Sequence, residues 1–306
     1  MEIKKITIVG MGALGVMYGD FFSRKLGKEN TEFVANKRRI KAFKEHGVFC
    51  NGHPCDFTLV DEEETGKPAD LLIFAVKATA LEEAIFTVRN KVSKDTIILS
   101  VLNGISSEEI IRSVYGTNQI IHCVVQGMDV IKTQSKVVYT QFGQFCIGIT
   151  EESKDKKQKL QDVVTLFNKL NIPYIIEKDI MRRLWSKFML NVGVNQAVMI
   201  YEGTYETVQK PGEARDLMQN AMKEVIILAQ KENVNVTQED FDGYIALIDQ
   251  MNPKGMPSMR QDGLAHRRSE VELFAGTVIA LANKHKIDVP VNKKIYELVM
   301  KMEDEY

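Results

Sequence analysis

Residues 5–22, "KITIVGMGALGVMYGDFF", are the most informative stretch for the architecture of the amino-terminal half of the chain. A short β-branched run ends at Gly10, and from Ala13 onward apolar residues recur at helical spacing. The run predicts a buried strand, and the spacing predicts a helix that packs against it. Gly10, Gly12 and Gly15 lie in or beside the turn between them. The stretch therefore predicts a strand, a tight turn and a helix.

The same alternation of strand and helix continues along the chain. We predict strands at residues 31–36, 69–76 and 95–104, and helices at residues 37–47 and 79–92. Such alternation is typical of βαβ units, whose parallel sheet carries helices on both faces. Runs at residues 119–125, 136–141 and 144–149 are expected to carry the sheet to about residue 150. A helix at 153–171 and a strand at 173–179 should complete a domain that ends near residue 178.

From Ile180 onward, periods near 3.6 replace the β-branched runs. We predict helices at residues 214–234 and 237–251, and a long one that begins at Ser258, where Gln261 could complete a capping box. The predicted fold class is α/β: a Rossmann-type parallel-sheet domain at residues 1–178 followed by an all-helical domain at residues 179–306.

Composition excludes several classes of protein. A chain of 306 residues suits two domains, and its net charge of −1 suggests neither nucleic acid nor an anionic membrane as a partner. No signal peptide and no apolar run of about 18 to 20 residues is apparent, so we expect a cytoplasmic protein. The segment "CNGHPC", residues 50–55, leaves a metal site conceivable, but a polar turn between two strands is favoured and we predict no metal.

The glycine spacing G-x-G-x-x-G, placed between a strand and a helix, predicts a dinucleotide-binding turn. The first glycine permits the turn, the second lets the backbone approach a pyrophosphate, and the third lets helix and strand pack closely. The amino terminus of the helix offers N–H groups to the phosphates. The predicted cofactor-binding residues of this turn are Gly10, Gly12, Ala13, Leu14 and Gly15.

The end of the second strand indicates which dinucleotide binds. A carboxylate there usually bonds the ribose 2′-hydroxyl of NAD, but this chain has Asn36, Lys37, Arg38 and Arg39. Cations suit a 2′-phosphate, so NADP is the predicted cofactor. For any single one of these residues, the alternative is a solvated basic helix start.

The apolar segment "LWSKFMLNVGVNQAV", residues 184–198, carries a polar stripe. Lys187, Asn191 and Asn195 are four residues apart and share one face of a helix. Burying such groups unpaired costs on the order of 2 kcal/mol or more each. A wet cleft with a polar ligand would satisfy them. Alternatively, Lys187 extends its amine to solvent and the asparagines bond to neighbouring helices.

A second polar set is Ser258, Asp262 and Glu270, which fall at spacings of four and eight and so are expected near one face of the predicted helix. Glu270 adjoins apolar residues, which suggests a carboxylate at the edge of an apolar surface. The alternative is a salt bridge to Arg267 or to another helix.

Five blocks of the sequence together resemble the ketopantoate reductase family. They are "GMGALG", "VKA" with Lys77, "LNG" with Asn103, "LWSKFMLNVGVN", and "SMRQD" followed by "SEVELFAG". Their order and approximate spacing match the family along the whole chain. The resemblance implies a Rossmann domain, a helical domain and a substrate cleft between them.

The resemblance also implies roles for individual residues. Lys187 would be the general acid, and Glu270 the carboxylate that binds a substrate hydroxyl and also contacts the cofactor. Asn103, Asn191, Asn195 and Ser258 would orient the substrate, with Asn103 also at the cofactor, and Lys77 would lie near the nicotinamide and ribose. The implied reaction is the NADPH-dependent reduction of 2-dehydropantoate to pantoate, for pantothenate and coenzyme A synthesis, in a possible homodimer.

Departures from the family pattern leave alternatives open. Gln196 stands where the family commonly has proline, Val198 follows in place of a hydroxyl residue, and Ala80 replaces a glutamine. Asn36 replaces the usual arginine at the end of the second strand. The chain could instead reduce a different 2-oxo acid, or be a non-catalytic NADP-binding sensor. Retention of Lys187 and Glu270 argues against the sensor.

Overall fold

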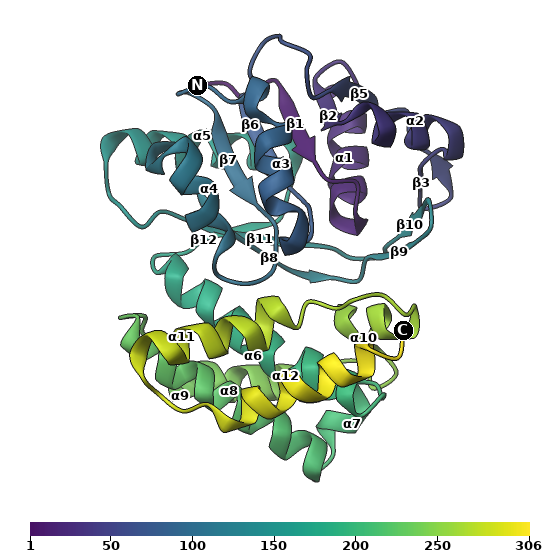
Figure 1. Cartoon of the computed structure of the whole chain (residues 1–306). Coiled ribbons are helices and arrows are strands. Elements are labelled where there is room, and N and C mark those ends of the chain that lie inside the picture. The colour runs from purple at the N-terminus through teal and green to yellow at the C-terminus, as the bar shows by residue number, and fades with distance from the viewer. The chain divides into compact units, whose positions relative to one another are not determined.

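The computed structural model describes residues 1–306, and their contacts divide them into two compact units, Met1–Ile180 and Met181–Tyr306. Figure 1 colours the chain from one terminus to the other. The first unit contains every strand, and the second is helix-rich. This confirms the predicted fold class. No helix of the chain has the length and apolar character that crossing a bilayer would require.

A five-stranded, fully parallel sheet forms the centre of the first unit. Its strand order is β5 (Thr58–Asp61), β2 (Thr31–Ala35), β1 (Ile6–Val9), β6 (Leu71–Phe74) and β7 (Ile97–Ser100). Every residue of β1, β2, β6 and β7 is buried, as expected for a sheet covered on both faces. The β-branched and leucine-rich runs of these strands supply the apolar side chains that such a sheet requires.

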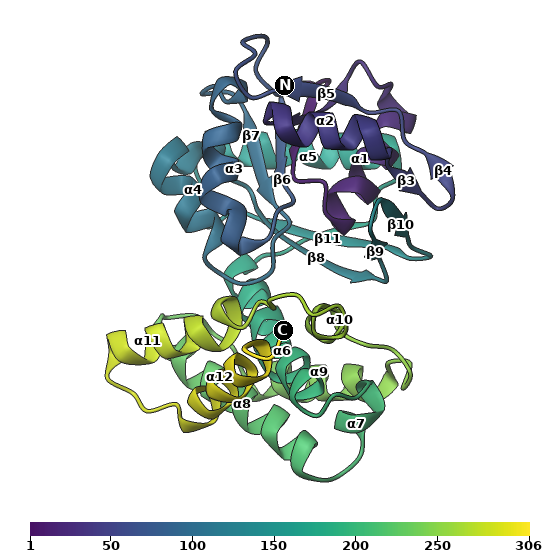
Figure 2. The ribbon, with the colours of Figure 1, turned by 45° about the vertical axis from the view of Figure 1, so that its right-hand side comes forward.

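Helices cover the sheet on both faces (Figures 1 and 2). One hydrophobic core joins Ile6 and Ile8 of β1 to helices α1 (Ala13–Leu26) and α5 (Lys154–Leu170). The other joins Val9 to α3 (Leu81–Thr87) and α4 (Ser107–Tyr115). Successive strand residues point to opposite faces, which explains why neighbours in β1 belong to different cores. Helix α2 (Lys37–His46) follows β2 and has no buried residue.

The later strands do not extend this sheet, so that prediction was wrong. A three-stranded sheet contains β12 (Tyr174–Ile176), β11 (Phe142–Gly148) and β8 (His122–Met128), with β11 antiparallel to β8. A parallel pair needs a crossover, usually a helix, whereas the chain between β8 and β11 contains only the short strands β9 (Ile131–Thr133) and β10 (Lys136–Val138). An isolated bridge between Ile98 and Ile120 links β7 to the start of this region.

The segment "CNGHPC" forms a β-hairpin, as the polar-turn prediction anticipated. Strands β3 (Phe49–Cys50) and β4 (His53–Pro54) are antiparallel, and β3 also pairs with β10 in a four-stranded sheet. Asn51 and Gly52 both have positive φ, 47° and 82°, the conformation that a two-residue type I′ turn requires. No group of three or more His, Cys, Asp or Glu side chains is placed to hold a metal ion.

Several short 3₁₀ segments complete the first unit. The helix predicted at residues 79–92 is divided into η1 (Ala78–Ala80), α3 and η2 (Arg89–Lys91), and η3 (Thr117–Gln119) follows α4. The sequence pattern therefore placed this helix correctly but overestimated its regular length.

Helix α6 (Ile180–Ile200) opens the second unit and contains the whole polar stripe. Helices α7 (Tyr205–Gln209), α8 (Glu213–Lys231) and α9 (Gln238–Gln250) are joined by short loops, and α12 (Pro290–Glu303) is the last helix of the chain. Thr237 caps α9 in a capping box with Asp240. The helical character predicted from the period is confirmed.

The long helix predicted from Ser258 is interrupted. Helix α10 (Ser258–Leu264) ends early, a π-helix follows at η4 (Glu272–Gly276), and α11 (Thr277–His285) continues from it. His266 has a positive φ of 47°, which stops helical propagation, and Pro257 rather than Ser258 is the N-cap. Glu270 therefore lies outside α10, so the prediction that it shares a helix face with Ser258 and Asp262 was wrong.

Candidate functional site

The glycine-rich turn lies at the carboxyl end of β1, and two of its glycines are required by the protein's own packing. Gly10 has a φ of 101°, and a Cβ there would lie 2.4 Å from the carbonyl oxygen of Ala75. A Cβ on Gly15 would lie 2.0 Å from the carbonyl oxygen of Gly10. No side chain can occupy either position without moving backbone, because the turn, α1 and the chain after β6 approach so closely.

Gly12 is different, because the fold leaves room for a side chain there. A Cβ on Gly12 would make only an ordinary contact, 3.6 Å from the carbonyl oxygen of Ala75. Gly12 is also the N-cap of α1, and no side chain caps this helix end. The first turn, which contains Ala13 and Leu14, carries no acidic residue. This end of α1 suits an anion that approaches the backbone closely.

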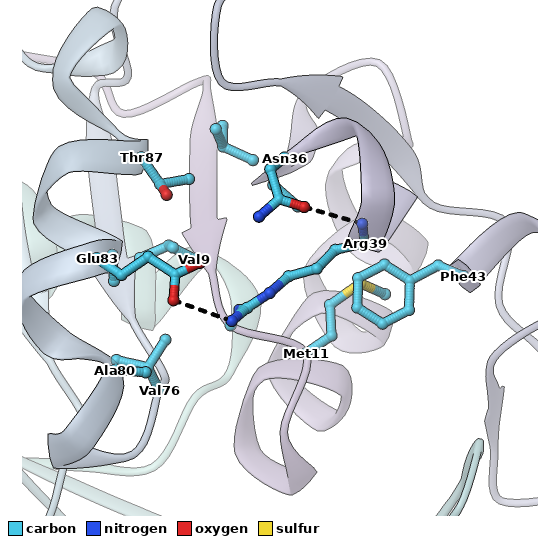
Figure 3. Close-up of a pocket in the computed structure, with 13 residues that line it drawn as sticks. Val9, Met11, Asn36, Arg39, Phe43, Val76, Ala80, Glu83 and Thr87 are labelled. Atoms are coloured by element: carbon cyan, nitrogen blue, oxygen red, sulfur yellow. Dashed lines mark hydrogen bonds and ion pairs between the residues drawn. The ribbon is translucent and has the colours of Figure 1, made fainter. Parts of the chain in front are cut away.

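A pocket opens beside this turn, bounded by the carboxyl ends of β1 and β2 (Figure 3). Gly10 and Met11 form one wall, Asn36 and Arg39 a second, and residues of α3 and the preceding loop a third. Most of the thirteen lining residues are apolar, and the polar groups are few. In an open parallel sheet, ligands bind at this edge, where strand order reverses direction about the first strand.

The polar residues that follow β2 differ in the contacts that they make. The side-chain oxygen of Asn36 accepts a hydrogen bond from the backbone N–H of Arg39 at 2.9 Å and so caps α2. The Arg39 guanidinium extends across the pocket to Glu83 of α3, with an N–O distance of 3.2 Å (Figure 3). Lys37 and Arg38 are exposed, and neither lines the pocket.

Lys132 of β9 is a residue that the sequence did not suggest. Its amine donates a hydrogen bond to the carbonyl oxygen of Met11, inside the glycine-rich turn, across a separation of 121 residues. The side chain is partly buried, and this burial lowers the pKa of the Lys132 amine. No spacing rule could have found it, because the β9–β10 hairpin brings it to the turn.

Lys77 and Asn103 follow β6 and β7, two adjacent parallel strands whose residues Phe74 and Ser100 are in register. Both residues therefore leave the sheet at the same edge as the glycine-rich turn. Lys77 is exposed and is the N-cap of η1, while Asn103 is half-buried.

A buried chain of side chains supports the loop that holds Asn103. The hydroxyls of Ser100 and Ser107 are 2.7 Å apart, and Ser107 donates to the carboxyl group of Glu108 at 2.8 Å. Burial raises the pKa of Glu108. These contacts connect the two ends of the loop and restrict its movement.

In the second unit, α6 is continuous through Lys187, Asn191 and Asn195, so these residues share one face. Lys187 is half-buried, whereas Asn191 and Asn195 are only 8% and 6% exposed. The amides are thus largely withdrawn from bulk water. Trp185 and Phe188, on either side of Lys187 in sequence, are buried as well.

Gln196, one of the departures noted above, has a structural role. Its amide nitrogen donates to the carbonyl of Val192 at 2.7 Å, and its oxygen accepts from the backbone N–H of Ala275 at 3.1 Å. Ala275 belongs to the π-helix η4. The glutamine therefore links α6 to the segment that follows Glu270.

The remaining predicted residues of the second unit lie around α10 and η4. Ser258 is exposed at the start of α10, and Glu270 is half-buried just before η4. Arg267, considered as a partner for Glu270, forms an ion pair with Asp262 at 2.9 Å.

Comparison with known proteins gives full-length similarity. The family model "Ketopantoate reductase PanE/ApbA" matches residues 6–152, and "Ketopantoate reductase PanE/ApbA C terminal" matches residues 179–303. A 2-dehydropantoate 2-reductase from Aquifex aeolicus is 24% identical over 302 residues, covering 97% of this chain and 96% of the relative.

Solved structures share the fold over both units. A D-mandelate dehydrogenase in ternary complex with NADH and anilino(oxo)acetate has a TM-score of 0.87 at 21% identity, covering 98% of this chain and 99% of that one. A PanE/ApbA family ketopantoate reductase from Ralstonia eutropha JMP134 has a TM-score of 0.82 at 22% identity, with the same coverage of each chain.

Proposed function

Because the chain belongs to the ketopantoate reductase family of oxidoreductases, we propose that it reduces the ketone of a 2-oxo acid with NADPH. The leading substrate is 2-dehydropantoate, giving (R)-pantoate for pantothenate and coenzyme A synthesis. The observation that carries the proposal is the stripe of Lys187, Asn191 and Asn195 on α6, a cation beside two amides that the helix withdraws from bulk water.

Residues 1–178 are proposed to bind the cofactor and residues 179–306 the substrate. The turn fits a dinucleotide, because the fold leaves room for a Cβ at Gly12 and a glycine there lets a ligand approach the backbone closely, and the pocket beside it suits an adenosine. Gly10, Gly12, Ala13, Leu14 and Gly15 would hold the diphosphate. Asn36, with Lys37, Arg38 and Arg39, would meet the 2′-phosphate.

When bound, the dihydronicotinamide supplies a hydride to the ketone carbon. The carbonyl oxygen then takes up negative charge, which the Lys187 ammonium stabilises before it gives that oxygen a proton. The products are an alcohol, the oxidised cofactor and a neutral amine that regains its proton from water. Lys187 is the proposed general acid.

The remaining side chains would orient the reactants. The Glu270 carboxylate would accept a hydrogen bond from a substrate hydroxyl, and Asn191, Asn195 and Ser258 would hold the substrate. Lys77 and Asn103 would lie at the cofactor, Asn103 also reaching the substrate. Fixed orientation of this kind lowers the entropy cost of bringing the reacting atoms together.

The test is loss of NADPH absorbance with 2-dehydropantoate, measured against a panel of other 2-oxo acids and against NADH. We expect Lys187→Ala to lower kcat at least a hundredfold, while cofactor affinity stays unchanged. Full turnover by Lys187→Ala, together with loss of activity in Asn191→Ala, would show that the general acid is misassigned.

A reductase of a different 2-oxo acid is the second candidate. The likeness to D-mandelate dehydrogenase at a TM-score of 0.87 favours it, as do Gln196 and Val198, which stand after Asn195 where the family commonly has proline and a hydroxyl residue. A higher kcat/KM for an aryl-substituted 2-oxo acid than for 2-dehydropantoate would select this candidate.

A further inference from the structure

Only two of the residues that line the pocket are charged, and they pair with each other. Arg39 comes from α2 and Glu83 from α3, and their side chains meet across the pocket with an N–O distance of 3.2 Å (Figure 3). The pocket lining therefore has no net charge. A cation at the end of β2 is placed for a 2′-phosphate, but here that cation already has an anionic partner.

Both ends of this pair are held in position by their helices. The backbone N–H of Arg39 donates to the cap residue Asn36, which fixes the start of α2. Glu83 lies in the first turn of α3, where the helix dipole stabilises a carboxylate. Both side chains remain partly exposed, at 42% for Arg39 and 51% for Glu83, so an incoming ligand can reach them and displace one from the other.

We propose that Glu83 is a cofactor-selectivity residue, which competes with the 2′-phosphate of the dinucleotide for the guanidinium of Arg39. The inference rests on the proposed function, since it concerns which nicotinamide dinucleotide that site prefers. A 2′-phosphate can form an ion pair with the guanidinium of Arg39 only after the ion pair between Arg39 and Glu83 is broken. A 2′-hydroxyl faces no such cost and can donate a hydrogen bond to the carboxylate. Glu83 thus reduces the preference for NADPH over NADH.

The experiment measures dissociation constants of NADPH and NADH by fluorescence titration of the full chain, for wild type and Glu83→Gln. We expect Glu83→Gln to tighten NADPH binding about fivefold, with no tightening for NADH. The matched control is Glu82→Gln, which makes the same charge change in the same helical turn at an exposed residue that does not line the pocket. It should leave both constants unchanged.

The Arg39→Gln background tests the route of the effect. If Glu83 acts by occupying Arg39, Glu83→Gln improves NADPH binding only while Arg39 is present. An unchanged ratio of the two constants in Glu83→Gln, or an equal gain in the Arg39→Gln background, would overturn the inference while leaving the proposed function intact. Failure of the wild-type chain to bind either dinucleotide would refute both.

Discussion

The amine of Lys132 donates a hydrogen bond to the carbonyl oxygen of Met11, the residue between the first two glycines of the turn. A partly buried ammonium at this place would gain an anionic partner when a diphosphate binds the turn. We expect Lys132→Met to weaken NADH and NADPH binding alike, by about tenfold. Fluorescence titration of both dinucleotides checks this.

Lys136, exposed in the neighbouring strand β10, provides the control for that variant. Lys136→Met makes the same change of charge in the same hairpin and should bind both dinucleotides as wild type does. Loss of NADPH binding alone in Lys132→Met would place its amine at the 2′-phosphate instead.

Gly12 and Gly15 should respond to substitution in opposite ways. Gly12→Ala fits the fold, so its melting temperature should match wild type while dinucleotide affinity falls at least tenfold. Gly15→Ala forces a Cβ to 2.0 Å from the carbonyl oxygen of Gly10 and should lower the melting temperature strongly. Thermal denaturation and titration, run on the same samples, separate the two effects; wild-type affinity in Gly12→Ala would argue against phosphate binding at this turn.

Gln196 should contribute to stability through the amide of Ala275. Gln196→Met keeps much of the side-chain volume but leaves that buried N–H without its acceptor, at a cost of about 1 to 3 kcal/mol. Chemical denaturation measures the loss in free energy of unfolding. Gln250→Met, at an exposed position in α9, is the control and should change stability little. Equal stability of the two variants would contradict the structural role.

Burial, together with the charges of Lys156 and Arg112, lowers the pKa of His122 to about 4. The unfolded chain binds a proton at this ring near the ordinary value of about 6.5, whereas the folded chain binds it only near 4. Stability is therefore fully present above the unfolded value and falls as pH drops between the two, by on the order of 2 kcal/mol.

Unfolding free energies measured across this pH range test the assignment. His122→Gln should flatten the decline, and the same change at His53, exposed in the β3–β4 hairpin, should preserve it. A decline that is identical in His122→Gln and wild type would assign it to other groups.

Local patterns predicted the parts of the fold that depend on local physics. The β1 strand, the turn and α1 appear where the "KITIVGMGALG" pattern placed them. Residues that are close together in the sequence determine both the burial of this strand on its two faces and the steric requirements of the turn. The separate three-stranded sheet was missed, since a run such as residues 119–125 reads the same whether its partner is parallel or antiparallel.

Some residues of the candidate site could likewise be predicted from local sequence patterns, and others could not. The stripe on α6 could be predicted from a four-residue spacing, and the pocket wall at Asn36 from its place after β2. Lys132 and Glu83 could not, because each reaches its place through the packing of an element distant in sequence. The prediction that Ser258 and Glu270 share a helix face was wrong, because no sequence pattern indicated that α10 ends at Leu264.

The π-helix η4 makes the orientation of the residues before it depend on how many residues this segment contains, as well as on which residues they are. A π turn accommodates one more residue than an α turn, so deleting a single residue from Glu272–Gly276 would let the segment close as an ordinary α-helix. The residues just before η4 would then be rotated about the helix axis by about 100° relative to α11. Glu270 would then point in a different direction around the helix axis, although this residue is not itself substituted. The side-chain oxygen of Gln196 would lose the backbone N–H from which it accepts a hydrogen bond.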